Sequence, residues 1–378
     1  MPESFQNVTF VGDGAMATVL ALLLESRGLN VTVWGPTAEN VAEVIQTREN
    51  RRYLPGHRLP DSIRLTASDS SCFRDADLIV SAIPTQYIRS VWERLVPHFP
   101  EGEAVPVVSV AKGIEKGTIL RPTQIIADVI AKQAANPQVP ALASLSGPSV
   151  ADELAKCLPA TVAAASEDTD FATKLQTAFT TQWFRVYTNP DLVGVELAGA
   201  LKNVIALAAG ILDGLQAGNN AKSALLSRGL AEITRLGVAM GATPETFFGL
   251  TGVGDLATTC FSPTGRNRTA GELLGKGKKL DQILEDIPGV VEGVPTTKAV
   301  VDLAQKHDVE MPITQAVNQV LFEDLDPLDA ISNLMSREPK TERVGLFASS
   351  QASLERGLFS HRTRTHQRLN STNPPKVE

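Results

Sequence analysis

Lys202 lies in an almost wholly apolar stretch of the sequence. Residues 194–212 contain only one other charged side chain, Glu196. A helix that is apolar on nearly all sides is buried, and burial lowers the pKa of a lysine toward the range in which its amine acts as a base. Two interpretations stay open here: a catalytic lysine, or a lysine whose ammonium group reaches solvent from a half-covered helix.

Asp255 is the second candidate for chemistry. It follows two glycines in residues 250–256, directly before a helix-prone segment. One interpretation is an N-cap, which is a common role for aspartate. The other is a carboxylate presented from a flexible loop, where it would orient Lys202 or a substrate hydroxyl.

Basic residues next to turns indicate an anionic substrate. Arg266, Asn267 and Arg268 follow the turn at 262–265 and open an expected helix. A helix N-terminus with guanidinium groups suits a phosphate ester. The alternative is a solvated helix end, although the helix dipole disfavours arginine in a first turn.

Further polar groups come at the ends of two expected strands. Lys112 follows the strand at 105–110, and Gly147 and Ser149 follow the strand at 141–146. These groups would offer an ammonium, backbone N–H groups and a hydroxyl to a ligand; a solvent-facing lysine and a plain turn are the alternatives. The residues together predict a dehydrogenase acting on a phosphorylated or a carboxylated alcohol.

A glycine-rich loop predicts the nucleotide site. The pattern GxGxxA, with Gly12, Gly14 and Ala17, lies between a strand at 7–11 and a helix at 18–27. Gly12 allows the tight turn, Gly14 leaves room for a pyrophosphate, and Ala17 lets the helix pack closely on the strand. A glycine turn without a ligand is the alternative.

The order of elements supports that loop. A second strand is expected at 30–34, which completes a β-turn-α-β unit, and further strands are expected at 77–84, 105–110 and 141–146. They are short and almost uninterruptedly apolar, as parallel strands covered on both faces are. Ligands of such sheets bind beyond the carboxyl ends of the strands.

After about residue 190 the pattern becomes helical. The expected organisation is α/β: an N-terminal Rossmann-type NAD(P)-binding domain at 1–190, an all-helical substrate and catalytic domain at 191–345, and a disordered tail at 346–378. The helices are expected at 193–215, 223–240, 244–250, 266–274, 280–285, 296–306 and 313–322.

Composition excludes several classes of protein. The 378 residues carry a net charge of −7, which disfavours general nucleic-acid binding. Three scattered cysteines and five histidines show no zinc-site spacing, so no metal is expected. The apolar stretch at 15–24 is too short to span a bilayer, which predicts a cytoplasmic protein without a membrane span.

With these motifs in view, the chain resembles the bacterial NAD(P)-dependent glycerol-3-phosphate dehydrogenases over about residues 7–340. The matching segments are GDGAMATVLA, YLPGHRLP, VAKGIE, LSGPSVADELAKCLPA, FRVYTNPDLVGVELAGALKNVIALAAGILDG, ALLSRGLAEITRLG, LTGVGDLATTC, GRNR, GVVEGVPTT and VEMPIT. The resemblance implies interconversion of sn-glycerol 3-phosphate and dihydroxyacetone phosphate, supply of glycerol 3-phosphate for phospholipid synthesis, and a homodimer.

The resemblance also implies roles for individual residues. Lys202 would exchange the proton of the C2 oxygen, with Asp255 in support. The substrate would contact Lys112, Gly147, Ser149, Lys202, Asp255, Gly265, Arg266 and Asn267. Beyond the glycine loop, the cofactor would contact Ala15, Met16, Lys112, Ala151, Arg266, Val290 and Glu292.

Two departures from the family pattern concern the cofactor. Ala15 and Met16 stand where the family commonly has serine and an aromatic residue. Residues 34–37, Trp-Gly-Pro-Thr, hold neither the acid that marks NAD nor the basic residue that binds a 2′-phosphate. The choice between NAD and NADP therefore stays open.

Two other functions are weighed. A 3-hydroxyacid or 6-phosphogluconate-type dehydrogenase would share the Rossmann domain, the helical domain and the buried lysine. A non-catalytic redox sensor would keep the glycine loop and lose the reactive residues. Retention of Lys202, Asp255 and Arg266 disfavours the sensor.

Overall fold

The computed structural model describes residues 5–100, 105–134, 138–339 and 341–342. Residues Met1–Ser336 form one compact unit and Arg337–Glu378 a second one. The fold below is that of the first unit. The tail expected at 346–378 lies outside the described residues.

A single sheet organises the N-terminal part. Within the described residues it has eight strands in the order β3-β2-β1-β4-β5-β6-β7-β8. The first six in this order are mutually parallel, β7 runs antiparallel to β6, and β8 is parallel to β7. The order 3-2-1-4-5-6 is that of a dinucleotide-binding domain. The strands are β1 (Asn7–Val11), β2 (Asn30–Trp34), β3 (Arg64–Thr66), β4 (Leu78–Ser81), β5 (Val107–Ser109), β6 (Leu142–Ser146), β7 (Ala160–Ser166) and β8 (Phe184–Asn189).

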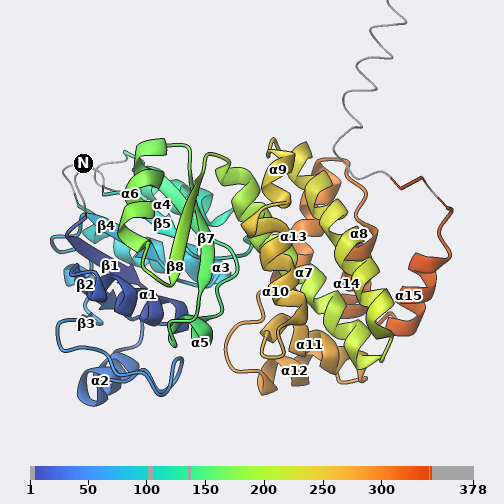
Figure 1. Ribbon diagram of the computed structural model, residues 1–378, viewed down its shortest axis with the longest axis horizontal. Coiled ribbons are helices and arrows are strands. Elements are labelled where there is room, and N and C mark those ends of the chain that lie inside the picture. The colour runs from blue at the N-terminus through green and yellow to red at the C-terminus, as the bar shows by residue number, and fades with distance from the viewer. Residues whose placement is uncertain (1–4, 101–104, 135–137, 340, 343–378) are drawn as a thin grey trace, which may run out of the picture. The chain divides into compact units, whose positions relative to one another are not determined.

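Helices cover both faces of this sheet, as its apolar strands predict (Figure 1). Successive residues of a strand point to opposite faces: Phe10 joins the apolar cluster that includes α1 and α6, whereas Val11 joins the cluster that includes α3 and α4. The helices of this part are α1 (Ala15–Ser26), α2 (Ala38–Thr47), α3 (Thr85–Leu95), α4 (Pro122–Gln133), α5 (Ala151–Leu154) and α6 (Thr169–Phe179).

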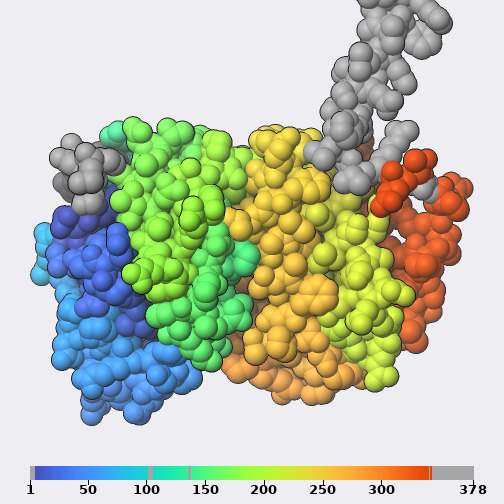
Figure 2. Space-filling model, in the orientation of Figure 1, coloured from blue at the N-terminus to red at the C-terminus, as the bar shows by residue number. Residues whose placement is uncertain are grey.

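The remaining described elements are helical. They are α7 (Leu192–Gly214), α8 (Gly218–Ala239), α9 (Pro244–Phe247), α10 (Asp255–Phe261), α11 (Arg266–Gly275), α12 (Leu280–Asp286), α13 (Gly293–Lys306), α14 (Pro312–Phe322) and α15 (Pro327–Met335). The expected fold class is confirmed. Figure 2 shows the sheet-bearing segments (blue to green) and the later helices (yellow to orange) gathered in separate blocks.

Helix α7 is the core of the helical part. Its length and composition would let it cross a membrane, but its most apolar window is wholly buried inside the protein. It packs against α11 so closely that a Cβ on Gly210 would meet the carbonyl oxygen of Arg268, and one on Gly271 would meet that of Leu207. The start of α11 is thereby held next to the middle of α7.

Several expectations from the pattern need correction. Strand β6 has an antiparallel neighbour, β7, so the sheet is not parallel throughout. Helix α1 begins at Ala15, directly after the glycine loop, rather than at Thr18. No bounds were expected for strands β3, β7 and β8 or for helices α2 to α6, α10 and α15. The short and the Ala/Thr-rich segments among them carry little periodic signal.

Candidate active site

The side chains of Lys202 and Asp255 meet at the centre of the candidate site. Lys202, from the middle of α7, donates to Asp255 Oδ1 over 2.5 Å and to Thr259 Oγ1 over 2.7 Å. Both members of the ion pair are buried, with side-chain exposures of 8% and 2%. The solvent-reaching lysine that the sequence left open is therefore wrong.

A second ammonium group shares the same carboxylate. Lys112, just beyond β5, donates to Asp255 Oδ2 over 2.8 Å and to the carbonyl oxygen of Gly147 over 2.9 Å. Its side chain is 19% exposed, so it borders the solvent-accessible side of the cluster. With both lysines protonated, the cluster of Lys112, Lys202 and Asp255 carries one net positive charge and attracts an anion.

The environment of Lys202 favours its neutral form. Burial lowers its pKa from 10.5 to about 8, the Asp255 carboxylate opposes this shift, and the Lys112 ammonium adds to it. An amine with a pKa near the working pH can both accept and donate a proton. The lysine predicted from the sequence thus has the properties of an acid–base group.

Asp255 is presented by helices, which neither interpretation of the sequence anticipated. It is the first residue of α10, it follows a π-helical turn at Leu250–Gly254, and Gly254 occupies the N-cap. Single π-helical turns inside helices are frequent at functional sites. The expected N-cap role and the expected loop position are therefore wrong, whereas the predicted contact of the Asp255 carboxylate with Lys202 is confirmed.

Gly147 and Ser149 lie in the cluster and contact Lys112. The Gly147 carbonyl accepts from Lys112; the backbone N–H groups expected to donate to a ligand stay a prediction. The Ser149 hydroxyl lies 3.3 Å from Lys112 Nζ and donates to the same carbonyl over 2.9 Å. Gly147 has φ +138°, a conformation that side-chain-bearing residues rarely adopt.

A chain of amides joins four segments around this cluster. Asn203 Nδ2 donates to the carbonyl of Lys112, and Asn267 Nδ2 donates to Asn203 Oδ1, both over 2.9 Å. Asn267 Oδ1 in turn accepts from the backbone N–H of Gly293 over 2.9 Å. The side chain of Asn267 is therefore largely engaged within the protein, which leaves its backbone N–H at the start of α11 for a phosphate.

Two of these residues, Asn203 and Thr259, were not predicted from the sequence. Asn203 follows Lys202 directly, and nothing in the sequence separated it from its apolar neighbours. Thr259 was findable in principle, since four residues separate it from Asp255 and residues at i and i+4 share a helix face. Without α10 in the predicted elements, that spacing carried no signal.

Arg266 differs from the buried residues of the site. It is exposed at the first position of α11, with Gly265 at the N-cap. Among the described residues, its guanidinium forms no ion pair. A Cβ on Gly289 would lie 2.6 Å from Arg266 Nη1, so the segment that contains Val290 lies beside it. The guanidinium is available to an anion at the start of α11.

The residues expected to contact a dinucleotide provide a fitting cradle. Gly12, at φ +112°, packs against the end of β4: a Cβ there would lie 2.7 Å from the carbonyl oxygen of Ala82. A Cβ on Gly14 would meet nothing within 4 Å, so the space above the start of α1 is open. The N-terminus of α1 has no side-chain cap, which leaves its N–H groups for a phosphate.

Glu292 borders this cradle near Lys112. Its Oε1 accepts from the backbone N–H of Thr85 over 2.8 Å. Glu292 Oε2 and Thr85 Oγ1 are buried and have no hydrogen-bond partner among the described residues. Both lie within 3.0 Å of the Cβ position of Gly113. Burial raises the pKa of Glu292 to about 7, and two unpartnered polar atoms fit a polar ligand such as a nicotinamide amide.

Ala15, Met16 and Ala151 complete the expected cofactor contacts. All three are partly buried and pack against the same apolar cluster, which includes β1 and α1. Their side chains carry no polar groups, so any contact with a dinucleotide is made by backbone or by apolar surface.

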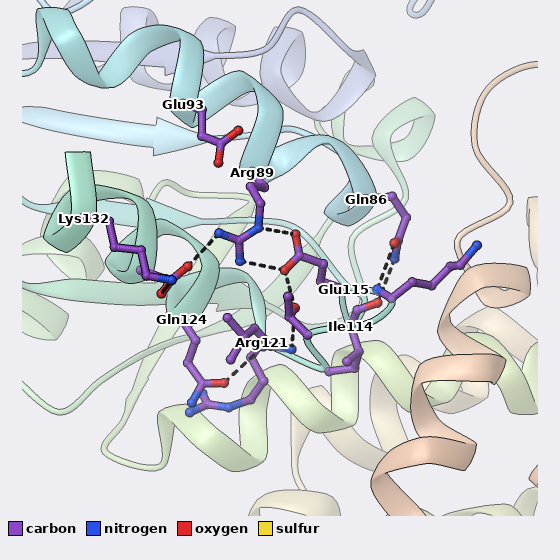
Figure 3. A network of polar contacts seen from close by, with 12 residues as sticks. Gln86, Arg89, Glu93, Ile114, Glu115, Arg121, Gln124 and Lys132 are labelled. Atoms are coloured by element: carbon purple, nitrogen blue, oxygen red, sulfur yellow. Dashed lines mark hydrogen bonds and ion pairs between the residues drawn. The ribbon is translucent and has the colours of Figure 1, made fainter. Parts of the chain in front are cut away.

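A polar network holds the segment that follows Lys112 (Figure 3). Arg89 donates to both carboxylate oxygens of Glu115, over 3.0 and 2.9 Å, and to Asp128 over 2.6 Å. Arg121 forms a buried ion pair with Glu196 of α7. These contacts tie the segment to α3, α4 and α7 and so fix the backbone that carries Lys112.

No metal cluster accompanies the site. Within the described ranges, no group of three or more His, Cys, Asp or Glu side chains is arranged to hold a metal ion.

Comparison with known families covers most of the chain. Two family models match: the NAD-dependent glycerol-3-phosphate dehydrogenase N-terminus over residues 7–172 and the C-terminus of the same family over residues 191–332.

Individual relatives agree with these matches. Glycerol-3-phosphate dehydrogenase [NAD(P)+] of Geobacillus kaustophilus is 47% identical over 338 residues, which is 89% of this chain and 96% of the relative. The protein of the same name from Bacillus subtilis is 48% identical over 332 residues, 88% of this chain and 94% of the relative. The crystal structure of glycerol-3-phosphate dehydrogenase from Coxiella burnetii superimposes with a TM-score of 0.82 at 36% identity, covering 88% of this chain and 99% of that one.

Proposed function

The chain belongs to the NAD-dependent glycerol-3-phosphate dehydrogenase family, and on this premise we propose that it interconverts sn-glycerol 3-phosphate and dihydroxyacetone phosphate with NAD(P). The proposal rests on the buried ion pair of Lys202 with Asp255. Lys112 pairs with the other carboxylate oxygen of Asp255. This arrangement unites an acid–base group and a positive charge next to the ends of the strands where a dinucleotide binds.

Lys202 is the group that exchanges the hydroxyl proton at C2. In the oxidation direction its neutral amine accepts that proton; in the reduction direction its ammonium donates one to the forming alkoxide. Asp255 stabilises the ammonium, and Lys112 adds positive charge where negative charge develops on oxygen. A nicotinamide dinucleotide, when bound, exchanges a hydride with C2.

The phosphate of the substrate binds at the start of α11. Support comes from the exposed guanidinium of Arg266 and from the N–H groups of the first turn, which has no side-chain cap. Gly265 at the N-cap leaves the approach unhindered. Ser149 and Gly147 line the substrate site through their contacts with Lys112.

The glycine loop and Lys112 would hold the dinucleotide. Gly12, Gly14 and Ala17 shape the loop, and the N-terminus of α1 binds the pyrophosphate. The open space above Gly14 and the unpartnered oxygen of Glu292 support this assignment. The proposed further contacts are Ala15, Met16, Ala151, Arg266 and Val290.

The decisive experiment is a steady-state assay of dihydroxyacetone phosphate reduction with NADH and with NADPH in parallel. We expect turnover with at least one of the two cofactors. Activity with a 3-hydroxy acid and none with dihydroxyacetone phosphate would contradict the proposal and favour the hydroxyacid dehydrogenase.

The family also supports a cellular setting. We propose a cytoplasmic homodimer that supplies glycerol 3-phosphate for phospholipid synthesis, with a Rossmann-type domain at 1–190 and a catalytic helical domain at 191–345. Sedimentation equilibrium of the full chain tests the assembly: a mass near 40.3 kDa at micromolar concentration, rather than twice that value, would contradict the homodimer.

A further inference from the structure

Asp13 is an acidic residue at an unusual place, between the two glycines of the nucleotide loop. Asn40, on α2, donates to Asp13 Oδ2 over 2.7 Å, and Asn50 donates to the main-chain oxygen of Asp13, also over 2.7 Å. Among the described residues, no side chain donates to the other carboxylate oxygen, Oδ1. The carboxylate is thus held in one position, with the Asn40 amide and the Asp13 backbone N–H as its donors.

That position is the end of β2. A Cβ on Gly35, the residue directly after β2, would lie 2.6 Å from Asp13 Oδ2 and 2.9 Å from Asp13 Cγ. The carboxylate therefore occupies the space that a side chain at the end of β2 would fill. Position 35 requires glycine, because any Cβ there would enter the space of the Asp13 carboxylate.

The end of β2 is where dinucleotide-binding domains distinguish their two cofactors. An acidic residue about 20 residues after the glycine loop binds the ribose 2′-hydroxyl of NAD, whereas a nearby arginine accommodates the 2′-phosphate of NADP. In this chain, residues 34–37 carry neither group. Asp13 brings a carboxylate to the same place from the other side of the crevice.

Two arginines lie near the Asp13 carboxylate, but neither is placed to bind a 2′-phosphate there. Arg94 packs over the Trp34 ring, but its Nε and Nη2 donate to Asp69 over 2.7 and 2.8 Å, so its charge is already paired. Arg52 attracts the Asp13 carboxylate electrostatically, yet it is exposed and stacks on the ring of Tyr53. Arg94 is therefore held at the end of β2, where its Nη1 also donates to the carbonyl oxygen of Pro36, but its charge is balanced by Asp69. Arg52 is held against Tyr53 instead.

We propose that Asp13 makes this protein selective for NAD(H) over NADP(H). Its carboxylate accepts a hydrogen bond from the ribose 2′-hydroxyl and repels a 2′-phosphate. The selectivity rests on the proposed function in one respect, namely that a nicotinamide dinucleotide binds along the glycine loop.

Direct binding measurements test the selectivity without turnover. The fluorescence of NADH and of NADPH is titrated with the full chain in the absence of substrate, at one ionic strength. We expect the wild-type protein to bind NADH tighter by about tenfold or more, since a carboxylate next to a 2′-phosphate weakens binding by like-charge repulsion. In Asp13→Asn, which keeps the size and the acceptor for Asn40, the NADH-to-NADPH ratio should fall by about tenfold.

Glu43→Gln is the matched control. Glu43 is an exposed acid one turn beyond Asn40 on α2. Its replacement by glutamine changes the net charge by the same amount as Asp13→Asn and leaves the glycine loop unchanged. We expect its cofactor ratio to stay within about twofold of wild type, as for other exposed charges.

The possible results separate the two proposals. Equal or tighter binding of NADPH by the wild-type protein, which needs no variant to fold, would overturn the role of Asp13 and leave the proposed function standing. An unchanged ratio in a folded Asp13→Asn would do the same. Absence of binding for both cofactors would overturn the proposed function together with the selectivity.

Discussion

At the scale of single residues, the chemistry depends on a lysine that is buried but not isolated. Burial favours the neutral amine of Lys202, while Asp255 and Thr259 provide partners for the ammonium. An unpaired ammonium in this apolar helix would cost several kcal/mol. The carboxylate makes the charged state accessible and the burial makes the neutral state accessible, so both forms needed for proton exchange exist near neutral pH.

Lys202→Ala removes the acid–base group and is expected to lower kcat about 10³-fold, within the usual range for such groups. The fold should survive because Lys112 still pairs with Asp255. Steady-state kinetics and thermal melting measure the two effects separately. Lys298→Ala, an exposed lysine on α13, serves as the control with unchanged kcat; near-normal turnover in Lys202→Ala would refute the catalytic assignment.

The lowered pKa of Lys202 predicts opposite pH dependences for the two directions. Reduction needs the ammonium, so its kcat/KM should fall as the pH rises through about 8. Oxidation needs the neutral amine, so its kcat/KM should rise over the same interval. Rate profiles between pH 6 and pH 10, recorded in both directions, check this. Profiles that fall or rise together would show that another group controls the proton transfer.

At the scale of elements, the site depends on how the segment after β5 is held. Glu196 of α7 accepts from Arg121 and from the backbone N–H and the hydroxyl of Thr123, so it anchors the start of α4. Burial raises the pKa of Glu196 and Arg121 opposes that shift. One buried carboxylate thus connects the sheet-bearing part to the helix that carries Lys202.

Glu196→Gln should destabilise the protein by about 3–5 kcal/mol, because it leaves the Arg121 guanidinium buried without its charge partner. Urea unfolding followed by circular dichroism measures the free energy of unfolding. Glu93→Gln is the control, since Glu93 is exposed and accepts a hydrogen bond from Gln133; it should change stability by less than about 0.5 kcal/mol. Equal effects of the two substitutions would mean that the Arg121 pair contributes little.

At the scale of the whole molecule, the acidic total charge and the anionic ligands have to be reconciled. The net charge is −7, so long-range attraction does not bring a phosphorylated substrate to the protein. We propose that attraction comes instead from Lys112, Lys202, Arg266 and the helix N-termini of α1 and α11, which act over about 10 Å at ordinary salt. The positions of these few positive groups therefore matter more for binding than the net charge of the chain.

A chain that ends at residue 345 should keep its activity. The family models end at residue 332 and the compact unit at Ser336, so both include every proposed site residue. We expect kcat/KM for dihydroxyacetone phosphate and Tm to match those of the full chain, because the residues removed lie outside the unit Met1–Ser336 that holds the site. A large loss of either would assign a role to residues 346–378.

Comparison of prediction with structure shows which signals were strong. The bounds of β1 and β2 agree with those expected from the sequence, because β-rich runs bounded by glycine turns are unambiguous. Helix α7 begins and ends one residue earlier than the range 193–215 expected from the sequence. Strand β7, Ala160–Ser166, was missed because its alanines have low β-propensity and its strand conformation depends on pairing with β6 and β8.

The sequence by itself determined the nucleotide loop, the two-part α/β and helical organisation, and the residue types of the site, since these follow from local periodicity and from glycine and charge spacing. Only the tertiary structure decided that Lys112 and Lys202 both pair with the carboxylate of Asp255. It also decided that Asp255 stands on a helix and that the Asp13 side chain lies at the end of β2. These contacts join residues that are 22 to 143 positions apart, and no local pattern encodes which distant segments the packing of α7, β5 and β2 brings together.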